Sequence, residues 1–151
     1  MKKSGYGVWG VVLVLGLLGA QYLVEQWEQR TVGSPKSGGE GDGAEVLRQA
    51  FAQERSKLWM EVAGQVAKTL PDDNKGSRHQ RFLLQVPGNE TVLVAHNIDL
   101  ADYVPLRKGD PIRIRGRYEW NEKGGVLHWT HHDPRGHIEG GWIRHAGTTY
   151  R

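Results

Sequence analysis

A two-residue alternation of apolar and polar side chains begins at Met60 and constrains the fold more than any other feature of this sequence. Five short runs follow this pattern, are rich in β-branched and aromatic residues, and are separated by segments rich in Gly, Pro, Asn and Asp. Such runs form strands, because successive side chains of a strand point to opposite faces. We therefore predict five strands, in the segments MEVAGQVAKTL, HQRFLLQV, ETVLVAHNI, DPIRIRGRYEW and GVLHWTHH.

Two glycines lie inside the predicted strands, Gly64 in the first and Gly116 in the fourth. Glycine normally weakens a strand, so its presence indicates a bulge or the sharp bend of a barrel corner. The segment LRKGDPIRIRGRYEW is also similar to a strand entry of oligonucleotide/oligosaccharide-binding (OB) barrels. We predict an all-β domain, a small five-stranded OB-like barrel, with an open β-sandwich as the alternative.

The residues before the strands follow other patterns. Residues 31–43 consist mainly of Gly, Ser and charged residues and are predicted to be a flexible linker. Residues 44–58 are predicted to form one amphipathic helix, although Glu54 interrupts its apolar face. The alternative is that these residues continue the linker and have helical propensity only. The apolar face consists of Leu47, Ala50, Phe51 and Leu58. The globular domain is thus expected to span residues 44–151.

The N-terminal segment is predicted to be a membrane anchor. Residues 6–24 carry no charge and approach the length of about 20 apolar residues that spans a bilayer. Lys2 and Lys3 precede this segment, so the positive-inside rule places the rest of the chain outside the cytoplasm. We expect residues 1–30 to anchor the protein in the inner membrane by a single pass, with the domain on the periplasmic side. A cleaved signal peptide is the alternative.

Composition narrows the chemistry that the domain can use. The net charge is +3 with neutral histidine, without a long Lys/Arg run, so a nucleic-acid partner is compatible with the sequence but not required by it. The chain has no cysteine, which excludes disulfides and thiolate ligands. A bound metal would have to use His, Asp or Glu. No feature indicates a specific protein partner.

Polar residues that can perform chemistry concentrate in residues 128–145, which hold five of the seven histidines. In a strand over residues 126–130, His128 would point away from Leu127 and Trp129. The histidine spacing matches no standard zinc motif, but imidazole is the commonest transition-metal ligand. We expect a functional polar site around one concavity, with a divalent metal as one version of it and structural hydrogen bonding as the alternative. The candidate metal ligands are His128, His131, His132 and His137.

Two more histidines lie at the ends of other predicted strands, His79 in GSRHQRF and His96 in AHNID. The ends of different strands meet at one rim of an antiparallel barrel, so these side chains are expected to share a cleft with the C-terminal histidines. The predicted catalytic residues are His79, His96, His131, His132 and Asp133.

Arginines occupy alternate positions of the fourth predicted strand. Three guanidinium groups on one face suit an anionic partner, because Arg binds phosphate or carboxylate in a planar fork. A solvated outer face is the alternative. Arg78 and Arg81, which lie near His79, also have two interpretations: they contact a phosphate, or they form a charged strand edge that discourages pairing with another chain. Together with aromatic residues that could stack on a ligand, the predicted ligand-binding residues are Arg78, Arg81, Arg113, Arg115, Arg117, Trp129, Trp142 and His145.

Several of these segments together resemble an uncharacterised family of bacterial domains. The resemblance covers about residues 59–151 and implies the domain boundary, but no activity. OB-barrel proteins in general include thermonuclease-type phosphodiesterases, whose Asp/Arg/Glu pattern is not recognisable here, so that similarity is one of fold alone. The segments that carry the family resemblance are LPDDNKGSRHQRFLLQVP, VLVAHNIDLADYVPLRKGD, GRYEWNEKGGVLHWTHHDP and GGWIRHAG.

The sequence favours two functions. The first is a membrane-anchored, periplasmic OB-like module that binds an anionic ligand such as nucleic acid or another envelope polymer, favoured by the arginines. The second is a His/Asp-based phosphodiesterase or nuclease, with or without a divalent metal, favoured by the histidine density. A structural partner of a membrane complex is a third, supported only by the predicted anchor.

Overall fold

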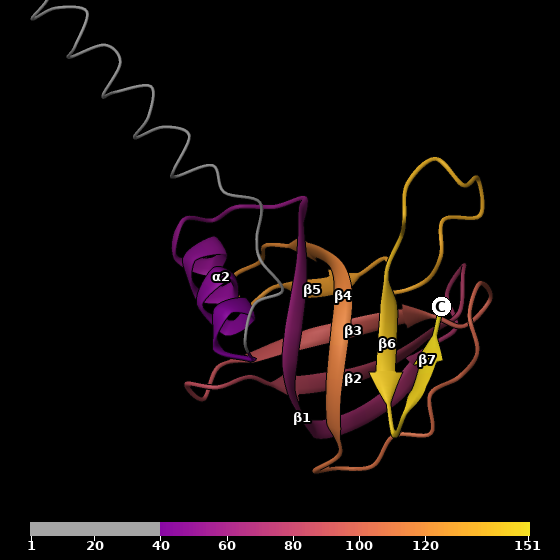
Figure 1. Cartoon of the computed structure of the whole chain (residues 1–151), viewed down its shortest axis with the longest axis horizontal. Helices are drawn as coiled ribbons and strands as arrows, with labels where there is room; N and C mark the ends of the chain where they lie inside the picture. The colour runs from indigo at the N-terminus through magenta and orange to yellow at the C-terminus, as the bar shows by residue number, and fades with distance from the viewer. Residues whose placement is uncertain (1–39) are drawn as a thin grey trace, which may run out of the picture. The chain divides into compact units, whose positions relative to one another are not determined.

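The computed structural model describes residues 40–151 (Figure 1). The predicted membrane segment, residues 6–24, and residues 31–39 of the predicted linker lie outside this range. Within residues 40–151, no helix is both long and apolar enough to cross a membrane. The described elements are α2 (Glu40–Ala52), β1 (Leu58–Asp73), β2 (His79–Gln85), β3 (Thr91–Asn97), β4 (Pro111–Glu119), β5 (Val126–His128), β6 (Trp142–His145) and β7 (Thr148–Tyr150).

Five strands form a closed ring in the order β1-β2-β3-β5-β4, in which β4 returns to β1. Only β3 and β5 are parallel; the other neighbours in the ring are antiparallel. The ring closes because β1 changes partner, pairing with β4 over residues 58–65 and with β2 over residues 65–73. This confirms the predicted all-β, barrel-like domain. The open β-sandwich alternative is wrong, since the sheet closes on itself.

Both strand glycines lie at points of close backbone approach. Gly64 lies where β1 changes partner, and a Cβ there would overlap the backbone oxygen of Gln85. At Gly116 a Cβ would lie 2.8 Å from the backbone oxygen of His128, in the neighbouring strand. Gly64 therefore has the position expected of a barrel corner, where a side chain would keep the strands apart.

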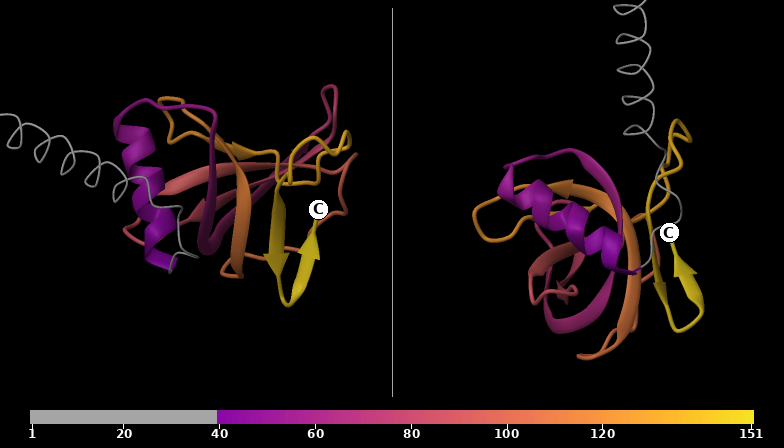
Figure 2. Two further views of the ribbon diagram at one scale, coloured as in Figure 1. Left: turned by 45° about the horizontal axis from the view of Figure 1, so that its top comes forward. Right: turned by 60° about the vertical axis from the view of Figure 1, so that its left-hand side comes forward.

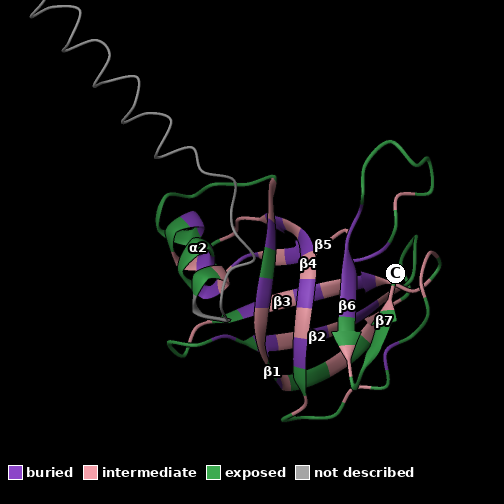
Figure 3. Ribbon diagram, viewed as in Figure 1, coloured by how far each residue is buried: buried purple, intermediate pink, exposed green. Residues whose placement is uncertain are grey.

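The core fills the inside of the ring. Along β2, β3 and β4, every second residue is buried and its neighbours are partly exposed, an alternation that is visible in Figure 3. Complete burial of one large apolar side chain stabilises a fold by about 1.5–3 kcal/mol, so these residues hold the barrel together. The largest buried apolar side chains of the domain, including one each from β5 and β6, are Tyr118, Phe82, Leu84, Ile114, Leu127 and Ile143.

Helix α2 lies across the end of the barrel where β1 begins and β4 ends (Figure 2). It begins inside the predicted linker and ends at Ala52, so its predicted range of 44–58 was displaced. Gly43, assigned to the linker, is a packing residue, because a Cβ there would overlap the backbone oxygen of Glu61. Leu47 and Ala50 are buried as predicted, whereas Phe51 is 40% exposed and Leu58 belongs to β1.

A C-terminal hairpin, β6–β7, was not predicted, and it raises the number of strands in residues 40–151 to seven. Strand β6 pairs with the first half of β4, residues 112–115, whereas β5 pairs with residues 117–119. The short β5 leaves the rest of this edge of β4 uncovered, and β6 takes that place. Segments of three or four residues are too short to display a clear alternation, which is why the hairpin escaped prediction.

Candidate functional site

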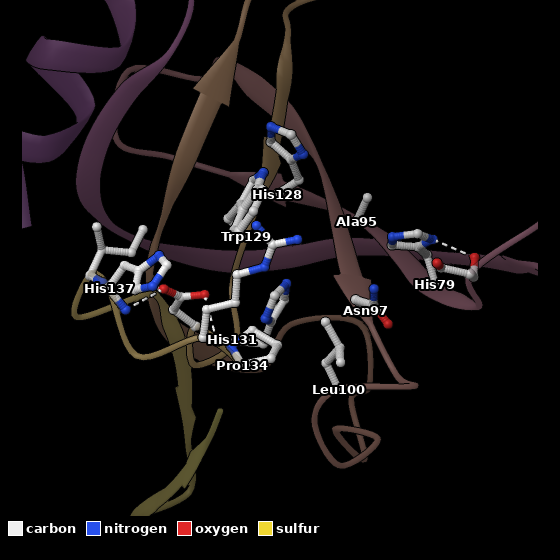
Figure 4. Close-up of a pocket in the computed structure, with 13 residues that line it drawn as sticks. His79, Ala95, Asn97, Leu100, His128, Trp129, His131, Pro134 and His137 are labelled. Carbon is white, nitrogen blue, oxygen red and sulfur yellow. Dashed lines mark hydrogen bonds between the residues drawn. The ribbon is translucent and has the colours of Figure 1, made fainter.

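A pocket opens at the end of the barrel opposite α2, where β2 begins and where β3 and β5 end (Figure 4). Its volume is about 630 Å³. We call it the rim pocket. Its lining combines polar and apolar side chains: Ser77, His79, Ala95, Asn97, Leu100, His128, Trp129, His131, Asp133, Pro134, Arg135, His137 and Ile138.

A left-handed residue at the end of β5 brings two neighbouring side chains into this pocket. Leu127 points into the core and His128 away from it, as predicted. Trp129 then adopts a φ of 55°, a conformation that is rare for a bulky residue. As a result Trp129 lines the pocket beside His128, and Thr130 takes the buried position. The prediction that Trp129 shares a face with Leu127 was therefore wrong.

The ring of Trp129 is held between charged and polar neighbours. The guanidinium of Arg117 lies 5.3 Å from the ring centroid. The ring of His131 stacks on it at a centroid distance of 5.7 Å and an interplanar angle of 25°. The left-handed backbone of Trp129 costs conformational energy, which these contacts must offset. Residues strained in this way cluster at functional sites.

Two of the lining histidines are fixed in the same tautomer by backbone carbonyls. Nδ1 of His131 lies 2.6 Å from the oxygen of His132, and Nδ1 of His79 lies 2.8 Å from the oxygen of Ser77. A carbonyl only accepts, so Nδ1 donates its hydrogen in both rings, and Nε2 carries the lone pair when the ring is neutral. Figure 4 draws this hydrogen bond of His79 as a dashed line, with the second ring nitrogen on the side of Ala95. Nε2 is therefore the ring nitrogen that the backbone bond leaves available in both histidines.

His128 differs from these two because its charged form is disfavoured. Burial lowers its pKa, and the positive charge of Arg117 acts in the same direction. Glu119 opposes this shift but lies 3.5 Å from Nε2, too far for a strong hydrogen bond. The imidazole of His128 thus lines the pocket in its neutral form.

His96 does not share the cleft, contrary to prediction. It points into the barrel, because its neighbours in β3, Ala95 and Asn97, take the outward positions. Its Nε2 donates to the backbone oxygen of Asp102 at 3.1 Å, and its Nδ1 accepts from the hydroxyl of Thr130 at 2.8 Å. Burial lowers the pKa of His96. A fully buried ring with both nitrogens bonded has a structural role.

Asp133 organises the loop after β5. Its carboxylate accepts hydrogen bonds from the backbone of Arg135 at 3.1 Å, His137 at 2.8 Å and Ile138 at 3.2 Å. These bonds lower the pKa of Asp133. Because its oxygens already serve the loop, the carboxylate positions the residues that follow it. Arg135, which sequence reasoning missed, enters the pocket in this way, and the Asp-Pro-Arg-Gly turn is the signal that could have indicated it.

The three remaining histidine candidates lie in different places. His137 lines the pocket and is exposed, whereas the side chain of His132 is exposed outside the lining. His145 lies on β6, away from the pocket, with its Nε2 3.0 Å from Asp110. Among residues 40–151, no three His, Asp or Glu side chains are arranged to hold a metal ion. The predicted metal set of residues 128, 131, 132 and 137 thus has no support in this arrangement.

The arginines of β4 share one outer face, as predicted, but each has carboxylate partners. Arg113 lies 3.2 Å from Glu61, and Arg117 lies 3.1 Å from Glu119. Arg115 lies 3.7 Å from Glu61 and 3.4 Å from Glu139. These ion pairs neutralise much of the positive charge on this face. The sequence pattern had predicted that this charge would bind an anionic ligand.

The other predicted ligand-binding residues are also occupied within the domain. Arg78 lies 2.7 Å from Asp99, and Nε of Arg81 donates to the backbone oxygen of Pro71 at 3.0 Å. Trp142 is only 7% exposed and lies under the guanidinium of Arg144, at 4.2 Å. Of the eight predicted ligand-binding residues, only Trp129 lines the rim pocket.

Fold and site together define a small closed β-barrel, with one end covered by a helix and a histidine-rich pocket at the other. Residues 40–151 match the family described as "Protein of unknown function (DUF3465)", and the chain belongs to that family. The predicted membership of an uncharacterised domain family is thereby confirmed. The match begins at the first residue of α2, so the helix is part of the family domain. A comparison with curated proteins finds no match.

Proposed function

We propose that this domain is an OB-like binding module that takes an anionic ligand in the rim pocket. The single observation that carries this proposal is the charge balance of the lining. Four histidines and Arg135 line the pocket, and the one carboxylate among the lining residues, Asp133, already accepts three backbone hydrogen bonds. Among the lining residues, an anion entering the pocket therefore meets the guanidinium of Arg135 and no free carboxylate, and a histidine protonated at Nε2 would add a donor.

The position of the pocket in the fold supports the same proposal. A five-stranded Greek-key ring in which β1 pairs with both β2 and β4 is typical of OB barrels. In that fold, the face of the second and third strands and the loop before the second strand bind oligonucleotides and oligosaccharides. Here Ser77 comes from that loop, His79 from β2 and Asn97 from β3.

A titration with short single-stranded DNA tests the binding proposal. The detergent-solubilised full chain is expected to bind the oligonucleotide, and Arg135→Ala should weaken binding on the order of tenfold, because a charge-assisted hydrogen bond is lost. The matched control is Arg55→Ala, at an exposed position near the opposite end of the barrel, which should bind like the unchanged chain. An anionic polysaccharide run in parallel separates a nucleic-acid ligand from another polymer. Equal binding by both variants would refute the role of the pocket.

We also propose on which side of the inner membrane the domain lies. We place the domain on the periplasmic side of the inner membrane, anchored through residues 6–24, because that segment is uncharged and preceded by lysines. A reporter that is active only in the cytoplasm, fused after Arg151, should then give no signal. Strong reporter activity would reverse the orientation.

A second candidate function, cleavage of a phosphodiester, is favoured by one specific observation. His79 and His131 line the same pocket, and in both rings Nδ1 is bonded to a backbone carbonyl while Nε2 is not. A binding module that only holds its ligand does not need two such groups. Substitution of these histidines separates the two functions, since a pure binder should keep most of its affinity and an enzyme should lose turnover.

A further inference from the structure

The two histidines with fixed tautomers stand on opposite sides of one strand. His79 begins β2, His131 follows β5, and β3 lies between these strands in the sheet. Two strand spacings separate the backbones of β2 and β5 by about 10 Å. Figure 4 shows Ala95 and Asn97 of β3 between the two rings. Ala95 and both histidines line the same pocket, so a ligand that fills it meets both imidazoles, although His131 is only 6% exposed.

The lining supplies three of the parts that phosphodiester cleavage needs. Two imidazoles can act as general base and general acid, and Arg135 can neutralise the charge on the phosphoryl oxygens. The other titratable groups of the lining are His128, His137 and Asp133. The carboxylate of Asp133 is engaged by the loop, and burial keeps His128 neutral. The part not evident in the lining is an activated nucleophile.

RNA brings that nucleophile with it, since each phosphate has a neighbouring 2′-hydroxyl. We propose that the rim pocket cleaves single-stranded RNA by transphosphorylation, with His79 and His131 as the acid–base pair and Arg135 on the phosphate. This inference rests on the proposed function, because the same pocket must first bind the polyanion. It narrows the ligand to RNA and specifies the reaction.

The step is balanced without a redox partner or an added nucleophile. Nε2 of one histidine takes the proton of the 2′-hydroxyl while the 2′-oxygen forms a bond to phosphorus. The bond from phosphorus to the 5′-oxygen breaks, and the second histidine, which enters the step protonated at both ring nitrogens, donates its Nε2 proton to that oxygen. The products are a 2′,3′-cyclic phosphate and a 5′-hydroxyl end. DNA lacks the 2′-hydroxyl, so it should bind without being cleaved.

The experiment compares RNA and DNA oligonucleotides of one sequence with the full chain in the presence of a chelator. We expect cleavage of RNA to a 2′,3′-cyclic phosphate, no cleavage of DNA, and a rate that falls on both sides of an optimum, as a general acid and a general base require. One 2′-deoxynucleotide at the cleaved position should stop the reaction at that position.

Variants prepared in parallel decide whether the pocket is responsible. His79→Ala and His131→Ala should each lower the rate on the order of 10²- to 10⁴-fold, the usual contribution of general acid–base catalysis. Arg55→Ala should cleave like the unchanged chain, whereas undiminished cleavage in both histidine variants would overturn the proposal, since a contaminating nuclease would give that result. Thermal unfolding and binding of the DNA oligonucleotide show whether each variant is folded. His131→Asn, which keeps a polar side chain near the carbonyl of His132, should remain inactive while preserving the fold.

Each outcome has a distinct meaning. RNA that is bound but intact would overturn the cleavage proposal and leave the binding module standing. Failure to bind either oligonucleotide would overturn the binding function, and the cleavage proposal with it. Equal cleavage of RNA and DNA, or cleavage that requires an added divalent metal, would also overturn the acid–base proposal. Loss of RNA cleavage in both histidine variants that still bind DNA would support it.

Discussion

The two ends of the barrel differ in packing and in polarity. At one end, α2 presses Ala44, Leu47 and Ala50 onto the core, and the indole of Trp120 donates to the backbone oxygen of Phe51 at 3.1 Å. At the other end no helix of residues 40–151 covers the ring, and the lining contains four histidines and a tryptophan in a left-handed conformation. Packing at the first end thus stabilises the fold, while the second end retains polar groups and a strained backbone. In this molecule the closely packed end and the end with the histidine-rich pocket are separate regions.

The largest effect should come from the helix-covered end. Leu47→Ala removes a buried side chain and is expected to lower the free energy of unfolding by about 2–5 kcal/mol. Chemical denaturation measures this loss, and Val46→Ala, at an exposed position on the same helix, should change stability by less than about 0.5 kcal/mol. Under conditions where the variant stays folded, its affinity for single-stranded DNA should be unchanged. A matching loss of affinity would show that the two ends are coupled.

A middle-sized effect should come from His96, which lies beneath the open end. Burial lowers the pKa of His96 in the folded state, so the unfolded chain binds its proton more readily. This contribution to stability is present above about pH 6.5, the pKa of an unperturbed histidine, and is lost as the pH falls through the lower folded value. Between about pH 6.5 and that lower folded value, the free energy of unfolding should therefore decrease by up to about 1.4 kcal/mol per pH unit as the pH falls.

Substitution identifies the source of that slope. His96→Gln should flatten the decrease in stability between neutral pH and pH 5, whatever it does to stability at neutral pH. His132→Gln, at an exposed position, should leave the slope as it is. If the slope is the same in all three proteins, His96 is not the group that takes up the proton.

The smallest effect should come from the arginines on the outer face of β4. Arg113 is 40% exposed and its contact with Glu61 is a surface ion pair, a type that usually contributes at most about 1 kcal/mol. Arg113→Ala should therefore lower stability only slightly and leave the affinity for single-stranded DNA unchanged, unlike Arg135→Ala. A large loss of affinity in Arg113→Ala, measured in the same titration, would place the ligand on the strand face instead of the rim pocket.

Much of the fold was predictable because alternation depends on local chemistry. The five runs correspond to β1–β5, and Gly64 indicated a corner of the ring, because strand periodicity and glycine usage can be read from neighbouring residues. Gly43 misled the prediction, because its close packing against Glu61 depends on a segment far along the chain. Local patterns do not reveal which glycine meets another backbone.

The candidate site was predictable only in part. The concentration of histidines after β5 pointed to the region where the rim pocket lies, but the left-handed turn at Trp129 and the inward direction of His96 depend on where a strand ends. The partners of the arginines on β4 could not be foreseen, since Glu61 meets them only after the ring closes. Charge seen along one strand does not show which charges remain once the neighbouring strands are in place.

The pairing of β1 with β4 also determines how the chain reaches its native state. Glu61 and Arg113, neighbours across the closed ring, are 52 positions apart in the chain, whereas β1 meets β2 through a short turn. Contacts between distant segments slow folding, because a long loop must be ordered before they form. During synthesis the first half of β1 has no partner until residue 119 has emerged, and it is exposed to pairing with other chains. Ring closure is thus expected to be the slow, aggregation-sensitive step in the maturation of this domain.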